Sequence, residues 1–216
     1  MKILNAKKSQ IESNLNQLFE AVGDAIEKAV DCLNSRDIAA CDALIQNDPS
    51  INDRRRMIEQ DCLVAIASQQ PVAHDLRDII ADSHIASELE RLGDYACDIA
   101  ASVKRMDDAS LDNLGMTNIL AMSRLAREML SLVMRANQEG DAQLARQISA
   151  LDDKMDALFK ETIEVVLNAM RSAPELVTNG TSVLWIIHNL ERYGDRTTNI
   201  AEQVVFRLES RTTNLG

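Results

Sequence analysis

Residues 88–100 read ELERLGDYACDIA, and residues 189–201 read NLERYGDRTTNIA. The two stretches lie 101 positions apart, and eight of the sixteen residues at 85–100 are identical to their counterparts in the second stretch. Outside this region the two halves match only in their hydrophobic pattern. Similarity at a fixed spacing is typical of a repeat architecture. The sequence therefore predicts one folding unit that occurs twice.

Apolar residues recur every three or four positions on both sides of a short acidic stretch at 107–115. This spacing predicts helices over 4–34, 37–68, 71–105, 116–138, 141–171 and 180–209. Pro49 is expected to kink or break the second helix, and Pro71 to lie in the first turn of the third. We therefore expect an all-α chain, a tandem repeat of two three-helix bundles with six long helices. The bundles are assigned to residues 1–106 and 116–216.

The composition supports helices and excludes several functions. Aromatic residues make up 3% of the 216 residues, and strand signals are nearly absent. A net charge of −11 argues against binding to nucleic acid, which needs basic surface. No signal peptide or membrane-spanning segment is expected. The four cysteines lack CxxC spacing and are interpreted as buried thiols of a reducing cytosol. No GxxxxGK[ST], GxSxG or HExxH motif occurs.

The repeated stretch places acidic residues four positions apart, where they share one face of a helix. Clustered carboxylates repel one another, and a bound cation converts this repulsion into attraction. Oxygen-rich sites suit hard cations such as Mg²⁺, Ca²⁺, Mn²⁺ or ferric iron. The preceding helix of each half adds further candidates, although an amide, Asn52, replaces one carboxylate in the first half. The candidate metal ligands are Glu90, Asp94, Asp98 and Asp48 in the first half, and Glu191, Asp195, Asp152 and Asp156 in the second.

Other interpretations of these residues stay open at this point. Acidic pairs at the same spacing also occur elsewhere, where a solvated helix face explains them. Gly93 and Gly194 indicate close approach of a bound group or of a neighbouring helix. A di-iron oxidase is disfavoured because no histidine follows a glutamate at Glu-x-x-His spacing. Trp185 is expected to anchor the core, and His188 to be a packed or capping residue.

The stretch QQPVAHDLRDII, followed by ELERLGDYACDIA and later by NLERYGDRTTNIAEQ, resembles the PhoU family of phosphate-signalling regulators. The likeness covers nearly the whole chain. It implies tandem three-helix bundles whose acid-x-x-x-Asp motifs bind clusters of metal ions (Fe, Zn, Mg, Mn or Ca). It implies ligand roles for Glu90, Asp94, Glu191 and Asp195, and less directly for Asp48, Asp152 and Asp156.

The resemblance also implies a function without catalysis. PhoU-like proteins repress the phosphate-starvation response and limit phosphate uptake. They connect the ATPase subunit of a Pst-type ABC phosphate transporter with a phosphate-sensing histidine kinase. We accordingly expect a cytoplasmic homodimer that reaches the membrane only through these partners. The alternatives are a carboxylate-bridged metal enzyme or metal store, and a helical adaptor that binds no ion.

This sequence departs from the family phrase at a few positions. Asp98 stands where asparagine is usual, and Tyr95 and Arg196 stand where histidine is common. Because Asn52 weakens the acid set of the first half, whereas the second half keeps its acids on both contributing helices, we expect the second-half site to bind cations more tightly.

Overall fold

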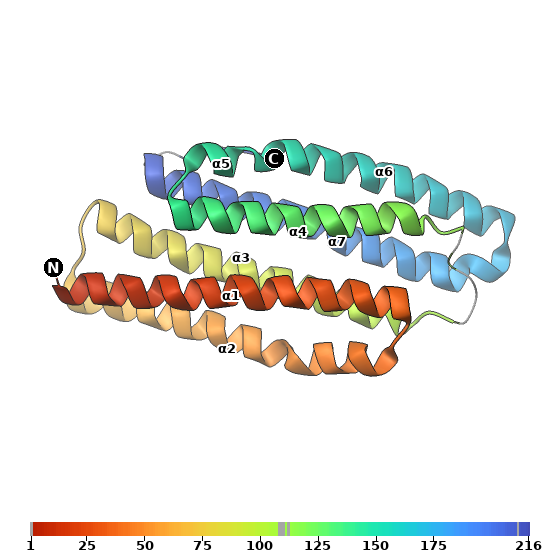
Figure 1. Ribbon diagram of the computed structural model, residues 1–216, viewed down its shortest axis with the longest axis horizontal. Helices are drawn as coiled ribbons and strands as arrows, with labels where there is room; N and C mark the ends of the chain where they lie inside the picture. The colour runs from red at the N-terminus through yellow and green to blue at the C-terminus, as the bar shows by residue number, and fades with distance from the viewer. Residues whose placement is uncertain (1, 108–110, 112, 211) are drawn as a thin grey trace.

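A computed structural model describes residues 2–107, 111, 113–210 and 212–216 (Figure 1). Nearly all of them are helical, and none of them lies in a strand. The expectation of an all-α chain with six long helices is confirmed. Part of the acidic stretch at 107–115 lies outside the described residues. The segments are α1 (Lys2–Ser35), α2 (Ile38–Gln69), α3 (His74–Val103), α4 (Met116–Glu139), α5 (Ala142–Arg146), α6 (Ile148–Ser172), η1 (Pro174–Leu176) and α7 (Val177–Glu209).

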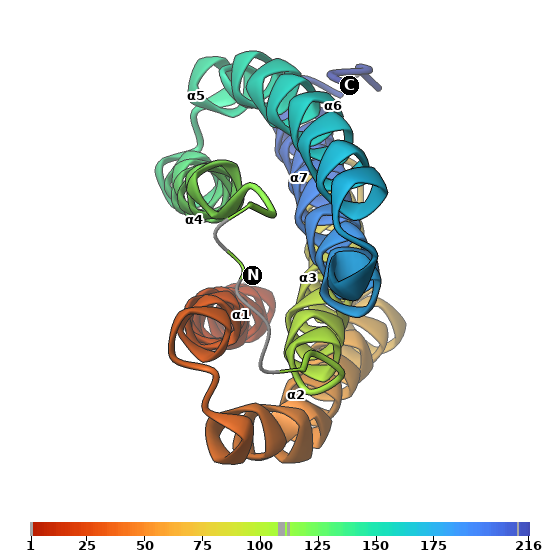
Figure 2. The ribbon, with the colours of Figure 1, turned by 90° about the vertical axis from the view of Figure 1, so that its right-hand side faces the viewer.

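The long helices form two layers. Viewed end on, α6, α7, α3 and α2 stand in one curved row, and α1 and α4 both pack on the same side of it (Figure 2). The two central helices, α3 and α7, come from different halves. Contacts pair residues 82, 88 and 95 of α3 with residues 207, 199 and 196 of α7, so the two helices are antiparallel. The two bundles therefore meet along the helices that carry the repeated motif.

Most helix boundaries follow from local chemistry. The Asp37 carboxylate accepts a hydrogen bond from the Ala40 amide at 3.0 Å and caps α2. Asp141 caps α5 in the same way. Gly140 ends α4 with a φ of +65°, a conformation that costs glycine little.

Three expectations about the helices need refinement. Helix α2 continues through Pro49 rather than breaking there, and it bends along its length (Figure 1). Proline lacks an N–H and crowds the preceding turn, which accounts for a bend. Pro71 precedes α3 by three residues and is not in its first turn. The helix expected over 141–171 is divided at Gln147 into α5 and α6.

The core is aliphatic and spans both layers. On α1, the fully buried residues recur at helical spacing as Ile11, Leu15, Leu18, Val22 and Ile26. Burial of one such side chain contributes roughly 1.5–3 kcal/mol. These side chains pack against apolar faces of α2, α3 and α4 in one continuous cluster. The core therefore fixes the positions of α3 and α7.

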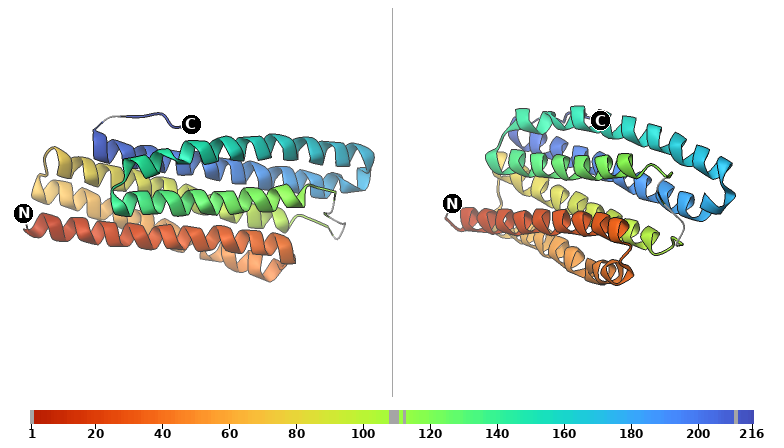
Figure 3. Two further views of the ribbon diagram at one scale, coloured as in Figure 1. Left: turned by 45° about the horizontal axis from the view of Figure 1, so that its top comes forward. Right: turned by 45° about the vertical axis from the view of Figure 1, so that its right-hand side comes forward.

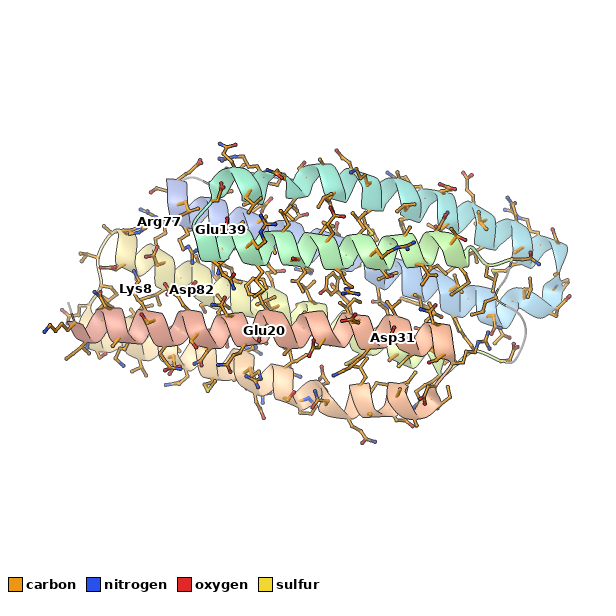
Figure 4. The ribbon with its side chains drawn as sticks, viewed as in Figure 1. Lys8, Glu20, Asp31, Arg77, Asp82 and Glu139 are labelled. Carbon is orange, nitrogen blue, oxygen red and sulfur yellow. The ribbon has the colours of Figure 1, made fainter. Side chains whose placement is uncertain are left out.

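A partly buried and a buried polar contact add specificity to this packing. Lys8 on α1 donates to Asp75 at 2.8 Å and to Asp78 at 2.6 Å. Arg207 on α7 pairs with Asp82 on α3 at 3.2 Å, with 2% of the Asp82 side chain exposed. Lys8 and Asp82 lie toward the same end of the bundle in Figure 4. The Asp82–Arg207 ion pair links the two halves of the chain.

Candidate metal centres and a groove between the repeats

The two copies of the motif lie near the middle of α3 and α7. Their glycines allow close helix packing. A Cβ atom on Gly93 would lie 3.0 Å from Ile51 of α2, and one on Gly194 would lie 3.2 Å from Asp152 of α6. Each motif helix is thus held tightly against the preceding helix of its own half. Of the two explanations considered for these glycines, helix packing has direct structural support.

The first acid cluster consists of Asp48 on α2 with Glu90 and Asp94 on α3. Arginines partly neutralise it. Arg91 donates to Asp94 at 3.1 Å and lies 3.6 Å from Glu90, while Arg55 lies 3.6 Å from the other Glu90 oxygen. Burial, with Glu90 and Asp48 next, still raises the pKa of Asp94. This cluster therefore has its own counter-ions.

Asp48 is engaged by its neighbours. It accepts a hydrogen bond from the Asn52 amide at 2.7 Å, and the Cys97 thiol lies 3.7 Å away. Burial, followed by the charge of Asp48, raises the pKa of Cys97 to about 12. The thiol therefore stays protonated near neutral pH and lacks the thiolate character of a metal ligand. Asn52 supports Asp48 in the place where the second half has a carboxylate.

The second acid cluster consists of Asp152 and Asp156 on α6 with Glu191 and Asp195 on α7. Burial, followed by the charges of Asp195 and Asp156, raises the pKa of Glu191 to about 7. The pKa of Asp152 is raised to about 6 by burial and then by Asp195 and Asp156. Burial also raises the pKa of Asp195. The members thus lie close enough to disfavour one another's ionisation.

Few positive groups balance this second cluster. Lys160 pairs with Asp156 at 3.1 Å. Within the described part of the chain, Asp152, Glu191 and Asp195 form no ion pair with a lysine or arginine. The His188 ring is 4.0 Å from Glu191, whose Oε2 atom is buried without a hydrogen-bond partner. The second cluster therefore carries more uncompensated negative charge than the first.

The donor chemistry of the second cluster fits an oxygen-preferring cation. Its buried Glu191 oxygen lacks a hydrogen-bond partner, and burial raises the pKa values of Glu191 and Asp152. As the side chains stand, however, the described residues contain no group of three or more His, Cys, Asp or Glu arranged to enclose one ion. Coordination by three of these carboxylates therefore requires their side chains to rotate toward one another.

Asp98 lies apart from the first acid cluster. It is exposed on α3 and lines a groove between α3 and α7. Its counterpart Asn199 donates to Glu88 at 3.3 Å. The third position of the motif thus faces the seam between the halves, because each further step of four residues rotates about 40° around the helix.

The α3–α7 groove has a volume of about 990 Å³. Trp185 lies on it and is 54% exposed, so the expectation that this tryptophan anchors the core is wrong. His188 also lines the groove, with 45% of its side chain exposed and its ring 6.0 Å from that of Trp185. The buried apolar residues near Trp185 are Val183, Ile186 and Ile187, which take a different face of α7.

The C-terminal residues lie beside the second acid cluster. Residues 212–216 fold back from the end of α7 (Figure 3). The Leu215 amide donates to Glu202 at 2.9 Å, and a Cβ atom on Gly216 would lie 3.5 Å from Asp152. This segment therefore forms one wall of the space next to Asp152 and Asp195.

Arg192 was not among the site residues predicted from the sequence, although the structure places it beside the second acid cluster. It matches Arg91, yet it lacks an ion pair in the described structure and its Nε atom is buried without a partner. It lies between the second acid cluster and the α3–α7 groove. Its presence in both copies of the motif was the signal that could have identified it.

The architecture is that of a duplicated helical-bundle protein with one acid cluster in each half. The model of the PhoU domain matches residues 15–103 and again residues 119–204. The chain belongs to the PhoU family. No helix of the described residues is both long and apolar enough to cross a membrane.

Relatives and a solved structure match most or all of this chain. The chain is 30% identical, over all of its residues and 98% of the relative, to a protein of Clostridium acetobutylicum named phosphate-specific transport system accessory protein PhoU homolog. A similarly named homolog 1 of Methanothermobacter thermautotrophicus is 33% identical over 83% of this chain and 82% of the relative. The crystal structure of the phosphate transport system regulatory protein PhoU from Streptococcus pneumoniae superposes with a TM-score of 0.91 at 27% identity, covering 97% of this chain and 99% of that one.

Proposed function

We propose that this chain is a regulatory accessory protein of a phosphate-specific transport system. In this proposal it couples a Pst-type ABC transporter, through its ATPase subunit, to a phosphate-sensing histidine kinase. It represses the phosphate-starvation response when phosphate is plentiful and moderates phosphate uptake. It acts as a cytoplasmic homodimer, reaches the membrane through its partners, and catalyses no reaction.

The observation that carries this proposal is the match, over all of this chain in one case and 83% of it in another, to relatives named as accessory proteins of phosphate transport. Matches confined to one helical bundle would support only a shared fold. Here both family-model segments are present, and the chain covers 98% of the relative from C. acetobutylicum. Long helical faces also suit a protein that acts by docking to partners.

We further propose that the acid clusters bind divalent or ferric cations. A cation at the second acid cluster would be held by Glu191, Asp195, Asp152 and Asp156, and it would relieve the repulsion that adds to burial in raising the pKa values of Glu191, Asp152 and Asp195. At the first acid cluster, Asp48, Glu90 and Asp94 would release Arg91 and Arg55 on binding a cation. Because release of existing ion pairs opposes binding, the second cluster is the tighter site. Asp98, exposed at the groove, contributes least.

The regulatory role is tested by deleting the gene and measuring phosphate-regulated alkaline phosphatase. We expect activity at high phosphate to rise in the deletion strain and to return to its repressed level when the intact gene is supplied. Unchanged repression in the deletion strain would contradict the proposal.

The cation role is tested by equilibrium dialysis of the purified chain against Mn²⁺ with elemental analysis. Glu191→Ala should remove more bound metal than Glu90→Ala, which changes the matched position of the other half. A larger loss in Glu90→Ala would reverse the ranking. The absence of bound Mn²⁺, Mg²⁺, Ca²⁺, Zn²⁺ and iron from the unmutated chain would contradict the cation role and support the alternative of a helical adaptor that binds no ion. Redox turnover of a bound ion would favour the metal enzyme or store.

A further inference from the structure

We propose that the α3–α7 groove is a docking site for an amphipathic helix of a partner protein. The apolar side chains of that helix face Trp185, and its acidic side chains contact Arg105 and Arg192. The proposal rests on the proposed adaptor function, which requires a protein partner, and it names the surface and the chemistry that the partner must have.

The groove has the form that a helix needs. Its walls are two antiparallel helices, and its floor includes two small buried residues, Ser102 and Ser182. Small residues between larger ones leave room for side chains of a docked helix, as in helix-in-groove recognition. A volume of about 990 Å³ is large enough for several side chains.

Three polar side chains of the groove already have hydrogen-bond partners. Ser102 donates to the Asp98 carbonyl and accepts from Arg105, and Asn189 donates to the Trp185 carbonyl. Thr181 donates to the Val177 carbonyl. Apolar side chains can therefore enter without leaving these groups unpaired, a cost of about 1–3 kcal/mol each. This favours an apolar helix face over a polar metabolite, which would need free donors and acceptors.

Two large apolar residues of the groove are exposed. Trp185 is the only tryptophan and is 54% exposed, and Val177, two turns earlier on α7, is 45% exposed. A large aromatic side chain left on the surface is typical of the residues that dominate binding energy at protein interfaces. We infer that Trp185 is the central contact.

The charges of the groove select an acidic partner. The chain has a net charge of −11, yet this groove carries Arg105 and Arg192, with Asp98 as its one carboxylate among the described residues. Arg105 is exposed just beyond the end of α3, and the Nε atom of Arg192 has no partner. The charge of Arg192 acts on Glu191 and Asp195 without forming an ion pair with either, so both groove arginines can form charge-assisted hydrogen bonds with a carboxylate from a partner.

The spacing of these groups predicts a pattern in the docked helix. Tyr95 and Arg105 line the groove ten residues apart on α3, a separation of about 15 Å at roughly 1.5 Å per residue. Arg192 lies one turn of α7 from Arg196, which contacts Tyr95, and this turn leads toward Arg105, so a partner helix needs acidic residues roughly seven to eleven positions apart. Apolar residues at i+3, i+4 and i+7 between them would face Trp185.

The test uses a synthetic, end-capped helical peptide of eighteen residues with leucines on one face and two glutamates eleven positions apart. Binding is measured by the anisotropy of a labelled peptide and by the emission of Trp185. We expect a blue shift of the tryptophan emission. Each of the variants Arg105→Glu, Arg192→Glu and Trp185→Ala should weaken binding at least tenfold, with unchanged circular dichroism. The matched control is Arg124→Glu, an exposed arginine on α4 that makes the same change in charge.

A charge exchange separates direct contact from a general electrostatic effect. A peptide with two lysines in place of the glutamates should bind the double variant Arg105→Glu, Arg192→Glu better than it binds the unmutated chain. Absence of peptide binding, an equal loss in Arg124→Glu, or failure of the charge exchange would overturn the proposal.

The alkaline phosphatase assay distinguishes failure of the groove from failure of the proposed function. A chain that binds the peptide through these residues but does not restore repression supports the groove and contradicts the regulatory role. A chain that represses equally well with and without the double variant overturns the groove and leaves the regulatory role standing.

Discussion

Replacing Glu191 by glutamine should stabilise the protein in the absence of divalent cations. Burial and the neighbouring carboxylates raise the pKa of Glu191 from 4.5 to about 7, which means that its charged form is disfavoured in the folded state. At about 1.4 kcal/mol for each factor of ten in the ionisation constant, the penalty is roughly 3 kcal/mol. Because solvent screens a group that is partly exposed, we expect about 1–2 kcal/mol at pH 8.

Glu90, which matches Glu191 in the first half, gives a control for which we expect the opposite change in the free energy of unfolding. Glu90 lies within 3.6 Å of both Arg55 and Arg91, so glutamine there removes more attraction to these arginines than repulsion from Asp94. Glu90→Gln should therefore lower the free energy of unfolding by about 0.5–1 kcal/mol. Two copies of one motif thus respond in opposite directions to the same substitution.

The assay is urea unfolding in EDTA, followed by circular dichroism at pH 8 and at pH 5. A raised folded pKa means that the native state binds more protons than the unfolded state between pH 4.5 and about 7, so stability falls as pH rises through this window. The gain from Glu191→Gln should therefore be present at pH 8 and nearly absent at pH 5. Destabilisation by Glu191→Gln at pH 8, or an equal gain at both pH values, would refute the reasoning.

Three further predictions concern packing and the seam between the halves. Asp82→Ala leaves the mostly buried Arg207 without its carboxylate and should cost about 3–5 kcal/mol by urea unfolding, and a loss below about 1 kcal/mol would contradict this. Gly93→Ala forces a methyl group to within 3.0 Å of Ile51 and should cost about 1–2 kcal/mol, whereas Gly23→Ala, whose nearest contact would be 3.6 Å, should gain about 0.5–1 kcal/mol. Tyr95→Arg brings two arginines together and should lower the thermal midpoint, and the added change Arg196→Tyr should restore it. An unrestored midpoint would show that these two positions do not depend on each other.

The order and extent of the helices could be largely predicted from the sequence, because apolar spacing and capping residues act locally. Asp37 and Gly140 mark helix ends in the structure as their chemistry suggests. The continuation of α2 through Pro49 and the division at Gln147 of the helix expected over 141–171 have no sequence signal that we can identify.

The acidic residues of the candidate site could be predicted from the sequence, but the positive groups that pair with them could not. The repeat identified Glu90, Asp94, Glu191 and Asp195, and the structure brings Asp152 of the preceding helix into the second set. Spacing along one helix could not show that Arg55 comes from α2 to Glu90. The exposure of Trp185, by contrast, had a signal. Val183, Ile186, Ile187 and Leu190 form the buried stripe of α7, and residue 185 falls outside that stripe.

The contact between Tyr95 and Arg196 explains one position at which the two copies of the motif diverge. These residues occupy matched positions, and Arg196 lies 3.4 Å from the Tyr95 hydroxyl. In two antiparallel helices related by an approximate twofold axis, a residue near the axis meets its own counterpart. Identical charged residues there would repel, so the duplication is stable only if the pair becomes complementary. Arg196 achieves this by donating to Tyr95 and by pairing with Glu88 at 3.4 Å. Gly93 and Gly194, which pack within their own halves, face no such constraint and stay identical.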